Sequence, residues 1–160
     1  MDRINIRFAT QEDTGLILRF IKELASFEKL EHEVVADEPQ IISSLFGETP
    51  QAECVIAELD GRPKGFAIFF HNYSTFLCRH GLYLEDLYVT PEARGKGIGI
   101  GLLKHLAELA IERGCGRMEW WVLDWNTPAI DLYKSLEAEA MDEFTIYRLK
   151  GKALEKFSQK

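Results

Sequence analysis

The most informative feature of this sequence is a glycine-rich loop between a predicted strand and a predicted helix. The apolar run from Gly81 to Val89 predicts a strand, Pro91 ends it, and Arg94-Gly95-Lys96-Gly97-Ile98-Gly99 opens an amphipathic helix. Alternating glycines leave backbone N–H groups accessible, and the dipole of the following helix adds positive potential at the same place. The segment is therefore predicted to bind a pyrophosphate.

Two common phosphate-binding patterns do not fit this loop. A Walker loop needs Ser or Thr after its Gly-Lys pair, but Gly97 follows Lys96, and Thr90 stands where the first glycine belongs. The dinucleotide pattern Gly-x-Gly-x-x-Gly fails because its last position is Ile100 or Leu102. The pattern that remains is Arg-x-x-Gly-x-Gly, and an exposed Lys96 could add a phosphate contact.

This remaining pattern resembles the acetyl-CoA loop of the GNAT superfamily of N-acetyltransferases. Further blocks resemble its diamine acetyltransferase branch, which includes the spermidine/spermine and thialysine enzymes. These blocks are Arg7-x-Ala9-Thr10, Ile21 to Leu30, Tyr83 to Val89, Asp124-Trp125-Asn126 and Ala129 to Lys134. The Phe27-Glu28-Lys29-Leu30 and Leu123 to Asn126 stretches are more similar to the thialysine enzymes.

The resemblance implies a set of cofactor contacts. The residues expected to contact acetyl-CoA are Leu87, Tyr88, Val89, Arg94, Gly95, Lys96, Gly97, Ile98, Gly99, Ile100, Asn126 and Tyr133. The backbone of Leu87 and Val89 is expected to pair with the pantetheine amides as an added strand would. No metal is implied.

Acyl transfer from a thioester to an amine makes demands that single residues can meet. An alkylammonium titrates near 10.4, so it must lose a proton, and the departing thiolate must gain one. The resemblance assigns the second task to Tyr133, which lies two helical turns after Asn126 and shares its face. It assigns cation binding, and a possible role as water-mediated base, to Glu85; its neighbour Asp86 is expected on the opposite strand face.

The expected acceptor is a small primary amine. Phe27 and Glu28, at the end of the first predicted helix, resemble substrate-recognising positions. Phe27 replaces a tyrosine of the polyamine branch, and Thr145 to Arg148 lacks its acid and tryptophan. These departures favour a thialysine-like aminoalkyl substrate over spermidine. Glu137 replaces a glycine after the catalytic tyrosine, so the turn there is expected to take another shape.

The pattern of elements predicts one α/β domain over residues 1–160, with helices on both faces of a mixed, mostly antiparallel sheet. The resemblance implies the GNAT fold with six to seven strands. Expected strands cover 3–8, 53–59, 64–73, 81–89, 117–123 and 141–149. Expected helices follow Thr10, start at Asp37, and cover 97–113 and 126–136, with a short basic one at the end.

Composition narrows the partners. A net charge of −7 disfavours nucleic acid, and it would attract a cationic substrate or simply aid solubility. No run is apolar and long enough for a bilayer or a signal peptide, so we expect a cytoplasmic protein. The three cysteines (Cys54, Cys78, Cys115) suit a reducing compartment. A homodimer is expected from the resemblance alone.

The sequence leaves several alternatives open. Cys78 and His80 are close in sequence but stand alone, and none of the four histidines has a matched partner, so no metal site is expected. The acceptor could be a peptide or protein amine. A non-catalytic acyl-CoA-binding module and a nucleotide-phosphate binder are weaker alternatives, although a silent module has no need of Tyr133 or Glu85.

Overall fold

The structure, a computed structural model, describes residues 3–159. The chain divides into two compact units, Met1–Trp121 and Val122–Lys160. The first unit contains a sheet and three α-helices, and the second contains the helices α4 and α5. The expectation of one domain over residues 1–160 stays a prediction.

The sheet of the first unit has the order β1-β2-β3-β4-β5. Neighbouring strands from β1 to β4 are antiparallel, whereas β5 pairs parallel with β4. The strands are β1 (Ile4–Phe8), β2 (Glu53–Leu59), β3 (Arg62–Ser74), β4 (Arg79–Val89) and β5 (Met118–Trp120). The α-helices of this unit are α1 (Thr14–Phe27), α2 (Glu38–Phe46) and α3 (Ile98–Glu112). The predicted mixed, mostly antiparallel sheet is therefore confirmed.

Local sequence signals account for the turns and helix ends. Asp60 and Gly61 connect β2 to β3 with φ angles of 51° and 78°, the left-handed backbone that a two-residue hairpin turn requires. A capping box joins Thr10 to Asp13 just before α1, and a second joins Asp37 to Gln40 at the start of α2. The predicted hairpin and both helix starts are confirmed.

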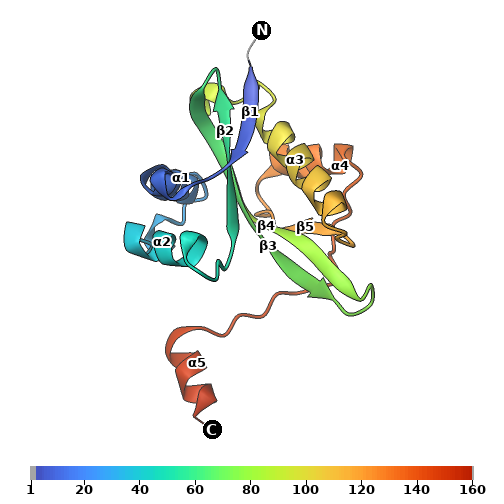
Figure 1. The fold of residues 1–160 in the computed structure, drawn as a ribbon. Helices are drawn as coiled ribbons and strands as arrows, with labels where there is room; N and C mark the ends of the chain where they lie inside the picture. Colours follow the sequence, from blue (N-terminus) through green and yellow to red (C-terminus); the bar gives the residue numbers. More distant parts are fainter. Residues whose placement is uncertain (1–2, 160) are drawn as a thin grey trace. The chain divides into compact units, whose positions relative to one another are not determined.

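Helices cover both faces of the sheet. α1 and α2 lie on one side of it and α3 on the other (Figure 1). The core under α1 and α2 is a cluster of buried residues: Ile17, Phe20, Leu24, Ile41, Cys54, Ile56, Phe66, Ile68 and Tyr88. On the other side α3 packs against β1, β3 and β4 through buried Ile98, Leu102 and Leu106. Burial of these two apolar faces holds the sheet in place.

The number of strands differs from the prediction. The described residues form five strands, not six to seven. The strand expected over 117–123 is reduced to Met118–Trp120, and the strand expected over 141–149 does not form. A strand exists only where a partner satisfies its backbone groups, and β4 pairs with β5 at three positions only. Apolar alternation along 141–149 could not reveal that the described chain gives this segment no partner.

The second unit contains α4 (Thr127–Ser135) and α5 (Gly151–Ser158), which confirms both helices expected there within a few residues. No helix within residues 3–159 combines the length and the apolar character that crossing a bilayer demands.

Candidate active site

The predicted phosphate loop connects β4 to α3. Gly97 is the N-cap residue of α3 with φ at 87°, and Gly95 has φ at 77°. A Cβ atom added to Gly95 would meet nothing within 4 Å, so conformation rather than lack of space requires glycine there. No side chain caps α3, and the first N–H groups of a helix have no partner within it. The loop therefore presents backbone donors of the kind an anion binds.

The loop borders a hollow of about 250 Å³. Seven of the twelve predicted cofactor residues line it: Val89, Arg94, Gly95, Gly97, Ile98, Gly99 and Ile100. The side chain of Tyr88 is instead buried in the core beside Phe20, with ring centroids 5.8 Å apart. Only the backbone of Tyr88 is therefore available to a ligand.

Arg94 ties this loop to the end of α1. Its Nε atom donates to the carbonyl oxygen of Val89 at 3.0 Å. Its guanidinium lies 5.0 Å from the ring centroid of Phe27 and 5.8 Å from that of Tyr88, within the range of cation–π attraction. The structure thus brings the predicted substrate residue Phe27 next to the predicted cofactor loop, a contact that sequence spacing did not reveal.

A β-bulge interrupts β4 beside this loop. Ile68 of β3 lies opposite Asp86, and the next residue, Phe69, lies opposite Leu84, so Glu85 is the extra residue. Bulges redirect side chains and are frequent beside active sites. After the bulge Asp86 lies opposite Ile68, on the face that carries α1, and Glu85 remains exposed. The expected simple alternation of Glu85 and Asp86 therefore does not describe this strand.

Two carboxylates, those of Glu28 and Glu85, act here on the carboxyl group of Asp86, and we call the three residues the carboxylate cluster. Burial, and to a lesser extent the charges of Glu85 and Glu28, together raise the pKa of Asp86 to about 6. Burial also raises the pKa of Glu28, at the C-terminal end of α1. Asp86 was not among the predicted site residues, because its burial depends on α1 and on the bulge rather than on its neighbours in sequence.

The ladder between β4 and β5 ends at Leu84 and Trp120. The N–H of Thr90 donates to the carbonyl oxygen of Lys64 in β3, and the backbone groups of a strand alternate in direction. The backbone groups of Leu87 and Val89 consequently point away from β3, towards the edge of β4 where the described chain places no strand. That edge has the arrangement that strand-like ligands use.

In the second unit, Asn126 is the N-cap residue of α4, and Tyr133 lies two turns further along the helix. The side chain of Asn126 makes no capping hydrogen bond, but its carbonyl oxygen accepts one from the N–H of Ile130 at 3.1 Å. Tyr133 is half-buried.

The turn after Tyr133 corrects another expectation. Glu137 adopts φ at 63°, so it keeps the left-handed conformation that a glycine would favour there. The N–H of Ala138 donates to the carbonyl oxygen of Tyr133 at 3.1 Å, which closes α4 in the manner of a Schellman motif. The helix therefore ends as it would with a glycine at this position, but Glu137 has a Cβ atom and is strained in this conformation.

Replacing Glu137 with glycine is therefore expected to raise the free energy of unfolding by about 0.5–1 kcal/mol, because it removes the left-handed strain at the end of α4. Chemical denaturation measures this difference. Glu139→Gly is the control, because residue 139 is exposed and has no positive φ, and it should bring no gain. Equal effects of the two substitutions would contradict the strain argument.

Comparison with known proteins agrees with this geometry. The sequence profile of the Acetyltransferase (GNAT) family matches residues 18–137. A thialysine N-epsilon-acetyltransferase of Bos taurus is 40% identical over 98% of both chains. An L-ornithine N5-acetyltransferase of Arabidopsis thaliana is 31% identical over 94% of this chain and 86% of its own. Among solved structures, an integron cassette protein from the mobile metagenome of V. cholerae superposes with a TM-score of 0.81, at 29% identity over 98% of both chains.

The match spans most of the chain and includes the strand, the glycine loop and α3, so the expected GNAT fold is confirmed apart from the number of strands. Members of this family use acetyl-CoA, and the donors at the start of α3 together with the hollow beside them fit its phosphates. This chain accordingly belongs to the GNAT family and is an acetyl-CoA-dependent N-acetyltransferase of the diamine and thialysine branch.

Proposed function

We propose that the protein transfers the acetyl group of acetyl-CoA to the primary amine of a small aminoalkyl substrate, thialysine-like or diamine. The carboxylate cluster is the observation that carries this proposal. It provides up to three negative charges beside the cofactor loop, and repulsion among them falls when an ammonium group binds. Two relatives are named for the acetylation of thialysine and of ornithine, and they support the same class of substrate.

For cofactor binding, the proposed phosphate site is the loop from Arg94 to Ile100, including Lys96. The backbone of Leu87 and Val89, directed at the open edge of β4, would hold the pantetheine arm, with Tyr88 contributing through its backbone. Asn126 is proposed as a further contact on the resemblance alone. Acetyl-CoA supplies the activated acyl group in this arrangement.

The amine must reach its neutral form before it attacks. An alkylammonium has a pKa near 10.4, so a nearby base must take its proton at neutral pH. We assign this role to Asp86, because a carboxylate with a pKa of about 6 is a stronger base than an ordinary aspartate. Glu85 and Glu28 would bind and orient the ammonium, and Glu85 remains a candidate for relaying the proton through water.

In the transfer itself, the amine nitrogen forms a bond to the acetyl carbon as the bond from that carbon to sulfur breaks. Asp86 already holds the first proton of the ammonium; the second leaves the nitrogen as the amide forms and returns through water to Tyr133, after the hydroxyl of Tyr133 has protonated the thiolate. The thiolate takes a proton from the hydroxyl of Tyr133, which we propose as the general acid. No acetyl-enzyme is needed, since both substrates are bound at the same time.

Phe27 would limit the length of the acceptor. It lies against Arg94 at the end of α1, on the same helix end as Glu28, and a ring held in this way leaves the ammonium site to a short flexible chain. This arrangement favours aminoalkyl compounds over peptides.

A thiol-release assay with acetyl-CoA tests the proposal. Thialysine, ornithine, lysine, short diamines, spermidine and a lysine-containing peptide are compared at equal concentration, with acetylated products identified by mass spectrometry. We expect kcat/KM to be highest for the aminoalkyl amino acids or diamines. Preference for the peptide would support the alternative acceptor class, and release without any acetylated amine would overturn the proposal.

We also propose that the protein is a homodimer. Apolar side chains of the second unit are exposed, with Phe144 at 73%, Tyr147 at 93% and Phe157 at 67%. Several such residues within a short segment are typical of surfaces that another chain covers. Sedimentation velocity should give twice the mass of one chain, and Phe144→Ser with Tyr147→Ser should shift it to the monomer. A monomeric wild type would contradict this proposal.

A further inference from the structure

Away from the loop and the carboxylate cluster, two histidines and a cysteine converge in the first unit. One donor atom from each of His71, His80 and Cys115 lies within 4.8 Å of the others. His71 is on β3, His80 is on β4, and Cys115 follows the left-handed Gly114 that ends α3. We refer to these three side chains as the His–Cys cluster.

The fold holds this cluster at several points. The cross-strand register places His71 opposite Leu82 and Tyr73 opposite His80, so the histidines are diagonal neighbours, with ring centroids 4.9 Å apart. The N–H of Gly116 donates to the carbonyl oxygen of His80 at 3.0 Å, which fixes Cys115 beside β4. Cys115 is buried, whereas both histidines are exposed and can adjust.

We propose that the His–Cys cluster is a binding site for a divalent cation of the zinc class. Two imidazole nitrogens and a thiolate are the donors that Zn²⁺ prefers, and three protein ligands leave a fourth position for water. Bonds of about 2.0–2.3 Å place tetrahedral ligand atoms about 3.5 Å apart, so the exposed rings need to move inward by about 1 Å.

Existing hydrogen bonds already leave each histidine ring with a nitrogen lone pair that a metal ion could bind. The Nε2 atom of His80 lies 3.1 Å from the carbonyl oxygen of Arg113; a carbonyl can only accept, so this nitrogen carries the proton and Nδ1 keeps its lone pair. A bond from the second ring nitrogen to a backbone carbonyl is the usual support of a metal-binding histidine. The Nε2 atom of His71 lies 3.4 Å from Nη1 of Arg113, which can only donate, so that nitrogen also presents a lone pair.

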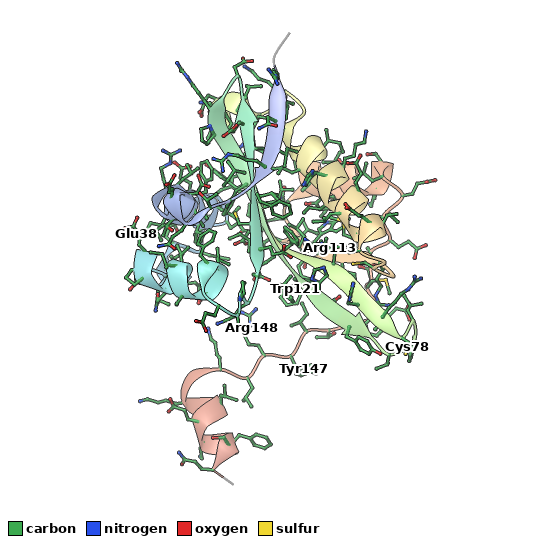
Figure 2. All side chains as sticks on the ribbon, in the orientation of Figure 1. Glu38, Cys78, Arg113, Trp121, Tyr147 and Arg148 are labelled. Carbon is green, nitrogen blue, oxygen red and sulfur yellow. The ribbon has the colours of Figure 1, made fainter. Side chains whose placement is uncertain are left out.

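Two guanidinium groups, those of Arg113 and Arg79, act on Cys115, and the one that also contacts His71 is already compensated. Arg113 forms two bonds with the carboxylate of Glu53, at 2.6 Å and 2.9 Å. A cation would displace only its longer contact with His71, while Glu53 retains the guanidinium. Figure 2 shows Arg113 well apart from Cys78, which lies in the turn between β3 and β4. Spacing along the chain draws attention to Cys78 beside His80, whereas the fold brings Cys115 and His71 to His80 instead.

Co²⁺ is a suitable probe because thiolate coordination gives a charge-transfer absorption band. Tag-free protein, first treated with a chelator, is titrated with Co²⁺ followed by absorbance and with Zn²⁺ followed by calorimetry. We expect one equivalent of either ion, a thiolate-to-cobalt band, and a higher melting temperature with Zn²⁺. Cys115→Ser should abolish the band, and His71→Asn and His80→Asn should each weaken binding more than about tenfold.

Matched controls separate this site from adventitious binding. Cys78→Ser and His32→Asn change residue types identical to the ligands at exposed positions outside the cluster, and both should bind as the wild type does. The histidine substitutions are at exposed positions, so they keep the test valid even if Cys115→Ser folds poorly. Absence of saturable binding, loss of the band in Cys78→Ser, or unchanged affinity in both cluster histidine variants would overturn the proposal.

Discussion

Tyr133→Phe is expected to lower kcat by about 10²–10⁴-fold while leaving the dissociation constant for CoA nearly unchanged. The substitution removes only the hydroxyl that we propose protonates the departing thiolate, and it keeps the ring and the helix around it. The chemical step therefore loses its acid, whereas contacts with the cofactor remain. Steady-state rates with the best acceptor, together with calorimetric binding of CoA, measure the two quantities separately.

Tyr73→Phe is the control for this substitution. Tyr73, on β3, is 62% exposed and has no part in the proposed reaction, so loss of its hydroxyl should not alter turnover. Melting temperatures of both variants show whether Tyr133→Phe disturbs α4. A folded Tyr133→Phe variant with wild-type kcat would remove Tyr133 from the mechanism.

Asp86→Asn is expected to lower kcat/KM by about 10²-fold or more, since the variant has no carboxylate to accept the proton of the amine. In the wild type, kcat/KM should fall as the pH drops through about 6, where Asp86 takes up a proton. The variant should lack this acidic limb. A rise in KM with unchanged kcat would show that Asp86 binds the cation without acting as the base.

The same substitution should stabilise the protein at neutral pH, by about 3 kcal/mol, because the pKa of Asp86 in the fold lies about two units above its ordinary value of 3.8. The direction in which stability changes with pH follows from proton uptake. Below pH 4 Asp86 is neutral in both the folded and the unfolded state, so it does not lower the free energy of unfolding. Between pH 4 and 6 the folded state holds more protons than the unfolded state, so stability falls as the pH rises. Above pH 6 the full destabilisation by the ionised Asp86 is present.

Chemical denaturation at pH 4 and pH 8 checks this dependence. Asp86→Asn should be more stable than the wild type at pH 8 and about equal to it at pH 4. Asp142→Asn, at an exposed position, should match the wild type at both values. A variant that is less active but also less stable at pH 8 would contradict the proposed strain at this carboxylate.

Local signals were sufficient for most of the fold. Asp60-Gly61, the capping boxes at Thr10 and Asp37, and the glycines around α3 each specify their turn or helix end through contacts within a few residues. The strand over 141–149 failed for the opposite reason, since pairing depends on a distant partner. The end of α4 shows a third case, because the helix and its closing hydrogen bonds impose a left-handed backbone on Glu137.

The glycine loop and its place between a strand and a helix could be predicted from the sequence, and the resemblance added the family and the cofactor. Each of these depends on short segments, whose residues are neighbours in the sequence. Only the tertiary structure decided that the bulge at Glu85 turns Asp86 towards α1, and that Cys115 meets His71 and His80. The physical reason is that burial, pKa and ligand convergence depend on which distant groups share a face of the sheet, and no spacing along the chain encodes that.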